Sequence, residues 1–262
     1  IELVGGIAGS NYVEPGPEGQ ASVVEPEEEY EAWIIGCAND GYISGYAFVG
    51  GIAGGSGTAD EYGDYGTAQT ATYITESYNA GHAMYSDYGV PSASSYGISV
   101  KFGGIAGGSS GIISECYNLG TVGTWGGIGS ADIYYDYIWA VGGIAGSTSG
   151  QIENSYNKGS INGLEYVGGI VGYARNASII NNYNVGYVYA YWTDGVSNSD
   201  YINSQICGYD DNNGSTIRGN YYERSIYRNL SEEEASVSRI SYGIIGKTIQ
   251  ELRNPLTYDG DI

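Results

Sequence analysis

Few side chains in this sequence could act as acids, bases, nucleophiles or metal ligands. His82 is the only histidine. A zinc peptidase motif of the His-Glu-x-x-His type needs two histidines, and a Ser or Cys triad needs a histidine with an orienting partner. His82 follows Gly81 at the start of an insertion between repeats. We therefore expect it in a solvent-facing turn rather than as a catalytic base.

The three cysteines indicate packing rather than chemistry. Cys37, Cys116 and Cys207 lack Cys-x-x-Cys spacing, which argues against a metal site or a redox pair. Cys37 and Cys116 fall at one repeat position, two repeats apart. Stacked coils spaced about 4.8 Å apart would hold them about 10 Å apart, beyond the reach of a disulfide. We expect all three to be small, buried side chains.

Carboxylates are abundant, but nothing in the sequence pairs them. A glycosidase needs two carboxylates about 5–9 Å apart. Five aspartates lie in insertions and could cluster: Asp87, Asp132, Asp136, Asp194 and Asp200. The stretch GYDDNNGS (208–215) makes Asp210 and Asp211 a weak candidate calcium site, although Tyr209 stands where the first Asp of a calcium loop belongs. A polar turn is the simpler interpretation.

Net charge excludes two classes of partner. The chain has 262 residues, 45 of them Gly and 29 Tyr, and a formal charge of −21. Such a chain cannot neutralise phosphates, which argues against nucleic acid and anionic membrane surfaces as partners. No stretch approaches the roughly 20 apolar residues of a membrane helix. We therefore predict neither a nucleic-acid partner nor a membrane partner. The sequence also predicts no required cofactor.

The elements that position these residues are set by two alternating phrases. The glycine phrase is VGGIAG at 4–9, 49–54 and 141–146, FGGIAG at 102–107 and VGGIVG at 167–172. Degenerate copies centre on Ile206 and Ile244. The second phrase, Asn-x-Gly, begins at Asn39, Asn79, Asn118, Asn157 and Asn184, with a worn copy at 220–222. The shortest repeat is 26 residues, too short for a propeller blade of about 40 residues but suited to one coil of a β-solenoid.

The sequence therefore predicts an all-β fold, a right-handed parallel β-helix of about six to seven coils with long loop insertions. We expect two or three short strands in each coil. The isoleucines of the glycine phrase should form an inward ladder: Ile7, Ile52, Ile105, Ile144, Ile170, Ile206 and Ile244. The paired glycines before them would supply a tight corner, a positive φ or a close backbone approach.

The Asn-x-Gly phrase predicts a turn in which Asn tolerates left-handed geometry. Stacked at one corner, its asparagines could form an amide ladder, as in cross-β structures. Four tyrosines, each directly before an Asn, should stack beside this ladder: Tyr78, Tyr117, Tyr156 and Tyr183. We assign residues 1–246 to the β-helix and 247–262 to a C-terminal trailing segment.

The phrases VGGIxG and I-x-x-[SC]-Y-N-x-G resemble the GLUG-motif repeat of bacterial surface proteins, with the best match over 141–172. That repeat occurs in large cell-wall-attached, adhesin-like proteins and precedes the catalytic part of IgA-cleaving metallopeptidases. The resemblance implies a right-handed β-helix without catalytic residues. It also implies a secreted module attached to the bacterial cell wall and flanked by other domains of a larger protein.

The insertions depart from that family pattern. Residues 82–101, 121–139 and 187–204 each follow an Asn-x-Gly phrase and should emerge from one side, whereas 57–73 leaves another corner. Exposed Tyr and Trp among small polar residues are typical of sugar-binding faces and paratopes. The candidate ligand-binding residues are Tyr85, Tyr88, Tyr134, Tyr135, Tyr137, Tyr191 and Trp192. Alternatively, these segments are extra strands whose aromatic residues cover the coils.

Two functions follow from these patterns. The chain would be a non-catalytic stalk or scaffold, and its aromatic loops would adhere to a host glycan or an extracellular protein. The alternative is a β-helix carbohydrate-active enzyme, either a polysaccharide lyase or a hydrolase. Such enzymes need carboxylates that are paired with each other or lie near Lys or Arg, but nothing in the sequence pairs the carboxylates, and basic residues are scarce in this chain. The enzyme alternative therefore rests on fold analogy alone.

Overall fold

The computed structural model describes residues 3–11, 31–57, 72–86, 100–124, 139–190, 202–211, 214–223 and 244–252. Within these ranges the strands form five sheets in which each pair of neighbouring strands is parallel. Sheet A contains β1 (Leu3–Gly5), β6 (Phe48–Gly50), β11 (Val100–Gly103), β16 (Trp139–Gly142), β21 (Tyr166–Gly168) and β26 (Ile202–Ser204). Sheet B contains β2 (Ala8–Asn11), β7 (Ala53–Ser56), β12 (Ala106–Ser109), β17 (Ala145–Thr148), β22 (Val171–Arg175) and β27 (Cys207–Asp211).

The other three sheets carry the rest of each coil. Sheet C contains β3 (Ala32–Ile35), β8 (Thr72–Thr75), β13 (Ile112–Ser114), β18 (Gln151–Glu153), β23 (Ser178–Ile180) and β28 (Thr216–Arg218). Sheet D contains β4 (Ala38–Asn39), β9 (Tyr78–Asn79), β14 (Tyr117–Asn118), β19 (Tyr156–Asn157), β24 (Tyr183–Asn184), β29 (Asn220–Glu223) and β30 (Ile244–Lys247). Sheet E contains β5 (Tyr42–Gly45), β10 (His82–Tyr85), β15 (Val122–Gly123), β20 (Ile161–Gly163) and β25 (Val188–Ala190).

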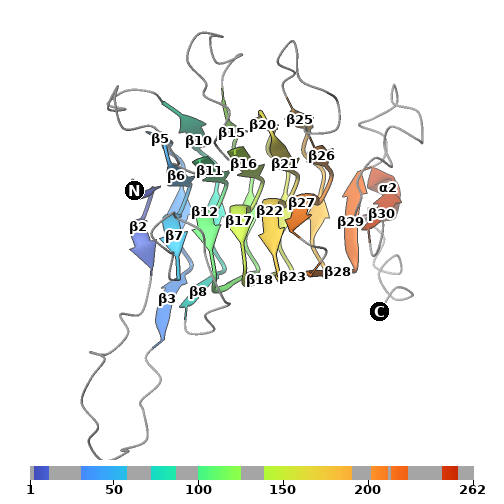
Figure 1. Ribbon diagram of the computed structural model, residues 1–262, viewed down its shortest axis with the longest axis horizontal. Helices are drawn as coiled ribbons and strands as arrows, with labels where there is room; N and C mark the ends of the chain where they lie inside the picture. Colours follow the sequence, from blue (N-terminus) through green and yellow to red (C-terminus); the bar gives the residue numbers. More distant parts are fainter. Residues whose placement is uncertain are drawn as a thin grey trace, which may run out of the picture.

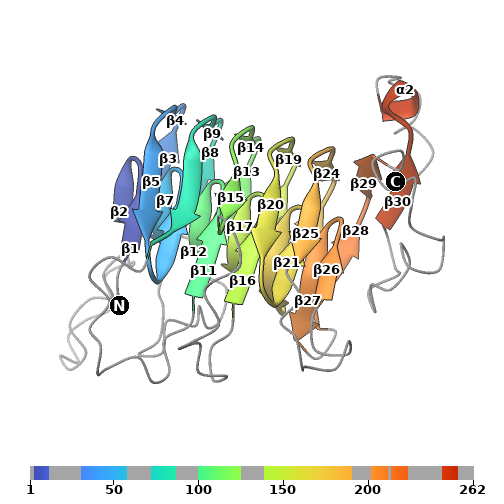
Figure 2. The same ribbon diagram turned by 90° about the horizontal axis from the view of Figure 1, so that it is seen from above.

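The chain visits the sheets in the order A to E and then begins the next coil, so the coils stack side by side (Figures 1 and 2). This confirms the predicted parallel β-helix. In the described part of the chain, five coils are complete and a sixth has four strands. The expectation of two or three strands per coil was wrong. The strands of sheet D are mostly two residues long, and such short strands leave little alternating pattern in the sequence.

Two separate apolar cores run along the coils. The first contains the predicted isoleucine ladder: Ile52, Ile105, Ile144, Ile170 and Ile206 are fully buried. The burial expected for Ile7 was wrong, because this residue of the first coil is 50% exposed. Isoleucines of sheet C, such as Ile74 and Ile113, pack against them. The second core joins sheet A to sheet E, for example Val141 to Ile161. Each coil therefore has two small apolar interiors instead of one.

The paired glycines permit close approach where the chain passes between these cores. A Cβ added to Gly104 would overlap the carbonyl oxygen of Gly143 in the next coil and the side chain of Asn118 in the same coil. Gly51 meets Asn79 in the same way. None of the paired glycines lies among the positive-φ residues of the described ranges. Of the three roles considered for these glycines, the structure selects the close backbone approach.

The predicted amide ladder is present in sheet D. The Nδ2 group of each Asn donates to Oδ1 of the Asn in the next coil, over 2.7 Å from Asn39 to Asn79 and 2.8 Å from Asn79 to Asn118, Asn118 to Asn157 and Asn157 to Asn184. Nδ2 of Asn184 donates to Oε1 of Gln205 over 3.0 Å. Four of the ladder side chains are fully buried: Asn79, Asn118, Asn157 and Asn184. A ladder that repeats through the first five coils fixes the register between them.

The left-handed residue of each coil lies one corner earlier than predicted. The ladder asparagines do not have positive φ. The residue three positions before each of them does, with φ between 50° and 63°: Gly36, Glu76, Glu115, Asn154 and Asn181. These residues connect sheet C to sheet D. The Asn side chain instead closes a local turn, because Oδ1 of Asn118 accepts from the Gly120 N–H over 3.2 Å.

The C-terminal end also departs from the prediction. Ile244 was expected to extend the isoleucine ladder, but β30 pairs with β29, with Ile244 opposite Asn220 in sheet D. This segment lacks the paired glycines that let the chain pass between the two cores. A single helical turn, α2 (Ile249–Leu252), follows. In the described ranges no helix is long and apolar enough to cross a membrane.

Candidate functional site

The three Tyr- and Trp-rich insertions share one corner of the β-helix. They connect β10 to β11, β15 to β16 and β25 to β26, and each therefore joins sheet E to sheet A (Figure 1). The fourth insertion joins β7 to β8, at the corner between sheets B and C. This confirms that three insertions leave from one side and the fourth from another. Most candidate residues lie outside the described residues: Tyr88, Tyr134, Tyr135, Tyr137, Tyr191 and Trp192.

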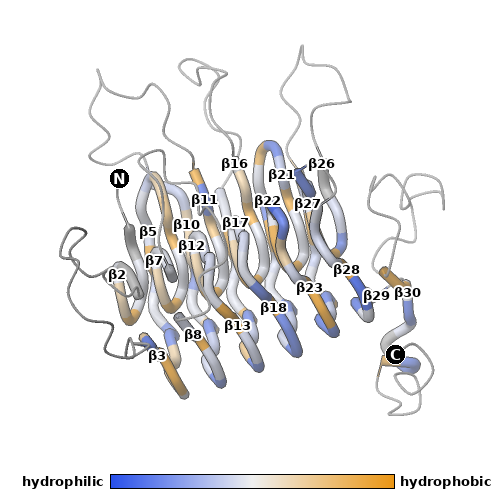
Figure 3. The backbone as a smooth tube through the Cα atoms, turned by 60° about the horizontal axis from the view of Figure 1, so that its bottom comes forward, coloured by the Kyte–Doolittle hydropathy of each residue, from blue (hydrophilic) through white to orange (hydrophobic). Residues whose placement is uncertain are grey.

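Each of these three insertions begins later than predicted. The residues after each Asn-x-Gly phrase first form a strand of sheet E, labelled β5, β10, β15, β20 and β25 in Figure 1. The tube of Figure 3 shows the same stack of coils. His82 is therefore on β10 and not in a turn. The signal that could have revealed sheet E is an apolar residue four positions after each ladder Asn, as at Ala83, Val122 and Ile161, whose side chains are buried.

Tyr85 is the candidate aromatic residue that the described ranges include. Its ring lies edge-on to Phe102, with 6.1 Å between ring centroids, and it packs against the second core. Its exposure is intermediate. Tyr85 thus has the packing role that the alternative interpretation gave to the insertion aromatics.

The outer face of sheet E carries a row of side chains that we call the sheet E row: Tyr42, His82, Thr121, Ser160 and Tyr187. Strand pairing sets Tyr42 beside His82 and continues the row through the later coils. The alternate residues Ile43, Ala83, Val122, Ile161 and Val188 face the second core. Tyr42 is 58% exposed and Tyr187 is 46% exposed, so aromatic rings stand at both ends of the row.

Polar contacts organise the ends of this row. The ring of His82 lies edge-on to Tyr42, with 6.2 Å between centroids, and its Nδ1 accepts from the Thr121 N–H over 3.4 Å. At the other end Tyr187 stacks with Tyr189, with 6.2 Å between centroids and 15° between the planes. Tyr189 is 42% exposed. The residues between the two aromatic ends have hydroxyl side chains, Thr121 and Ser160.

The second aromatic array is the predicted tyrosine ladder of sheet D. Tyr78, Tyr117, Tyr156 and Tyr183 stack with 4.8–5.0 Å between centroids and 3–7° between the planes. Because each inner ring covers the faces of its neighbours, the ladder offers ligands mainly ring edges. Burial raises the pKa of Tyr156 above its ordinary value. This ladder is suited to holding coils together rather than to binding a flat ligand.

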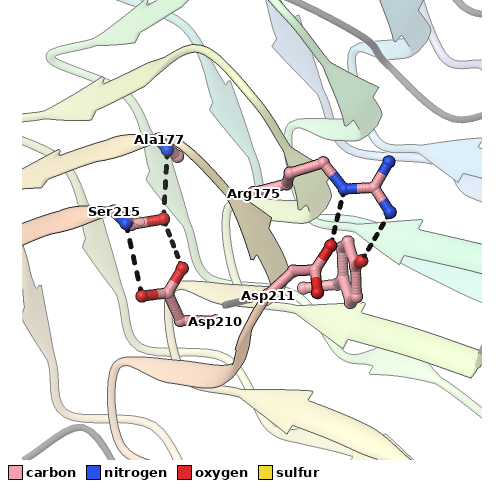
Figure 4. A network of polar contacts seen from close by, with 6 residues as sticks. Arg175, Ala177, Asp210, Asp211 and Ser215 are labelled. Atoms are coloured by element: carbon pink, nitrogen blue, oxygen red, sulfur yellow. Dashed lines mark hydrogen bonds and ion pairs between the residues drawn. The ribbon is translucent and has the colours of Figure 1, made fainter. Parts of the chain in front are cut away.

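Asp210 and Asp211, the weak calcium candidates, are bound to protein donors (Figure 4). The Asp210 carboxylate accepts from the hydroxyl of Ser215 over 2.5 Å and from its N–H over 3.3 Å. Asp211 pairs with Nε of Arg175 over 2.8 Å. In the described ranges no group of three His, Cys, Asp or Glu side chains is placed to hold a metal ion. These contacts fit the polar-turn interpretation, and the calcium site stays a prediction.

The predicted burial of the cysteines is confirmed for Cys116 and Cys207 and was wrong for Cys37, which is only partly buried against the first core. All three are free; Cys116 and Cys207 are buried and Cys37 is half-buried. Cys37 and Cys116 share a ladder with Ser77 and Ser155, since the N–H of Cys116 donates to the Ser155 hydroxyl over 3.1 Å. Burial raises the pKa of the Cys116 thiol to about 12 and that of Cys207 further.

A thiol-specific disulfide reagent such as DTNB should therefore distinguish these cysteines at pH 8. The thiolate is the reacting species, so we expect Cys37 to react in the folded chain and all three thiols to react in denaturant. Absorbance of the released aromatic thiolate counts the reacted groups. Cys37→Ser should abolish the native reaction. Rapid reaction of two or three thiols in the folded chain would contradict the burial of Cys116 and Cys207.

Comparison with known proteins agrees with the repeat described above. Residues 138–162 match the family model of the GLUG motif. The matched segment runs from the end of an insertion through β16, β17, β18 and β19 into β20, close to one full coil. No curated protein and no solved structure gives a significant match to the chain.

Proposed function

We propose that this chain is a non-catalytic module of a bacterial surface protein that serves as a stalk and as an adhesin. The GLUG motif, which is typical of a surface-protein repeat module, supports the first part. The stalk proposal is supported by ladders that link each coil to the next through side-chain amides and stacked tyrosines. Such a solenoid gains length coil by coil.

The observation that carries the adhesin proposal is the shared corner of three aromatic-rich insertions. The insertions leave the second, third and fifth coils. Their Tyr and Trp side chains would act together on one ligand, since large amphipathic rings supply contact area at low entropic cost. The proposed ligands are a host glycan or an extracellular protein. We place the module at the secreted cell surface, attached to the cell wall and flanked by other domains, with no nucleic-acid, membrane or cofactor partner.

The test is a binding screen of the chain against host glycans, mucins and matrix proteins. The triple variant Tyr135→Ala, Tyr137→Ala and Trp192→Ala should lose at least about tenfold in affinity, because truncated aromatic anchors dominate binding losses. It should still unfold cooperatively, which circular dichroism would check. Absence of any ligand for the unmodified chain would leave the stalk function alone.

A further inference from the structure

The outer face of sheet E carries no carboxylate, ammonium or guanidinium group, although the chain as a whole is strongly acidic. No Asp, Glu, Lys or Arg occurs in its strands β5, β10, β15, β20 and β25, nor at Thr121, Ser160 and Tyr187, which precede the last three. Charges lie beside it, at the corner between sheets D and E, which presents exposed Asp40 and Lys158. The corner between sheets C and D presents exposed Glu76 and Glu115. The strip offers a cationic ligand no partner for an ion pair, and in a chain of net charge −21 the surroundings repel anionic ligands.

The geometry of the strip is linear. The sheet E row passes through five coils, and four inter-strand steps of about 4.8 Å separate Tyr42 from Tyr187 by about 19 Å. The row thus extends parallel to the stacking direction of the coils. Beside it, Ser44 is exposed in the first coil, Met84 and Gly123 are buried in the second and third, and Asn162 and Tyr189 are accessible in the fourth and fifth. The accessible strip is therefore two side chains wide at both ends and narrow between them.

The side chains of the row combine aromatic rings with uncharged hydrogen-bonding groups. Exposed aromatic rings stand at the two ends, Tyr42 at one and Tyr187 with Tyr189 at the other. Between them lie the His82 ring, the Thr121 and Ser160 hydroxyls and the Asn162 amide, which can both donate and accept hydrogen bonds. Apolar ring faces together with uncharged hydrogen-bonding groups suit a ligand that has apolar C–H faces and many hydroxyl groups.

We propose that the sheet E row binds a linear, uncharged oligosaccharide aligned with the stacking direction of the coils. Its terminal sugars stack on Tyr42 and on the Tyr187–Tyr189 pair, and its central hydroxyls bond to Thr121, Ser160 and Asn162. This inference deepens the adhesin proposal, on which it rests, by naming a ligand class and a site. The site lies on the rigid coils and not in the insertions.

The test uses isothermal titration of the whole chain with three probes: a neutral linear mannohexaose, the corresponding mannobiose, and a hexameric mannuronate of alginate. We expect mannohexaose to bind at least about tenfold more tightly than mannobiose, because only the longer chain reaches both aromatic ends. Its affinity should be insensitive to salt, since no ion pairs form. The mannuronate should not bind measurably.

Tyr42→Ala and Tyr187→Ala should each reduce mannohexaose affinity to about that of mannobiose. The matched control is Trp33→Ala, because Trp33 is 47% exposed but lies on sheet C, stacked on Tyr73 with 3.8 Å between centroids. Thermal unfolding of each variant checks that the fold is retained.

Several outcomes would overturn this inference. Equal affinity for mannohexaose and mannobiose would exclude a site that spans the row, and binding of the mannuronate would exclude selection for neutral ligands. Loss of binding in Trp33→Ala, but not in Tyr42→Ala, would move the site to sheet C. If glycan or mucin binding depends on Tyr135, Tyr137 and Trp192 while the row variants bind normally, the adhesin proposal stands and the sheet E site fails.

Discussion

Asn118→Asp should lower the free energy of unfolding by about 3–5 kcal/mol at pH 7, the cost of leaving a buried charge without compensation. Nδ2 of Asn118 donates to the carbonyl oxygen of Gly120 and to Oδ1 of Asn157, each over 2.8 Å. A carboxylate has no proton for either acceptor, so both hydrogen bonds become contacts between oxygens. Because the site is fully buried, water cannot replace the lost partners.

The loss in Asn118→Asp should depend on pH in a defined direction. Burial and the two facing oxygens favour the protonated acid, so the pKa of this Asp is higher in the folded chain than in the unfolded chain. The folded state then binds more protons, and the stability of the variant relative to the parent falls as pH rises from about 4 through the folded-state pKa. The variant should be closest to the parent in stability near pH 4.

Urea unfolding at pH 4 and pH 7, followed by circular dichroism, measures both effects. Asn154→Asp is the matched control, since Asn154 is exposed and lies outside the ladder in the next coil. It should change stability by less than about 0.5 kcal/mol. A loss in Asn118→Asp no larger than in this control would show that the amide ladder contributes little to the stacking of coils.

The ladders could be predicted because a solenoid translates sequence spacing directly into contacts. When Tyr117-Asn118 and Tyr156-Asn157 recur in the same phrase, parallel stacking places them opposite each other without further information. The isoleucine, asparagine and tyrosine ladders follow from this rule. So does the position shared by Cys116 and Ser155.

The path of the chain within one coil was harder to predict, since it depends on contacts between residues that share no pattern. No feature of the sequence around Gly104 indicates that this residue contacts Asn118, which lies fourteen positions later and across the coil. The left-handed corner was missed because Glu115, a residue that seldom adopts positive φ, occupies it. Sheet E was missed because the polar residues of its outer face resemble the start of an insertion.

The candidate site, too, could be predicted from the sequence only in part. The common corner of the insertions followed from their position after each Asn-x-Gly phrase. The uncharged row did not, because Tyr42 and Tyr187 are 145 positions apart in the sequence and become parts of one surface only once sheet E exists. Charge at the level of the whole chain, −21, also conceals a local strip without charge.

Gly120→Ala should be among the most destabilising single substitutions in this chain, with a loss of more than about 3 kcal/mol. A Cβ at this position would overlap the carbonyl oxygen of Gly81 in the preceding coil and come within 3.0 Å of Nδ2 of Asn79. The atom in the way is backbone, so no rotamer change can relieve the overlap. The coils would have to separate, which weakens the amide and tyrosine ladders together.

The chain contains its own control for this substitution. Gly41 holds the same repeat position in the first coil, where a Cβ would meet nothing closer than Oδ1 of Asn39 at 3.4 Å. Gly41→Ala should therefore be neutral or stabilise by up to about 1 kcal/mol, since Ala restricts the unfolded chain more than Gly. Urea midpoints of the two variants test the pair. Equal effects would mean that this glycine serves the turn within one coil, whereas the expected difference assigns it to the distance between coils.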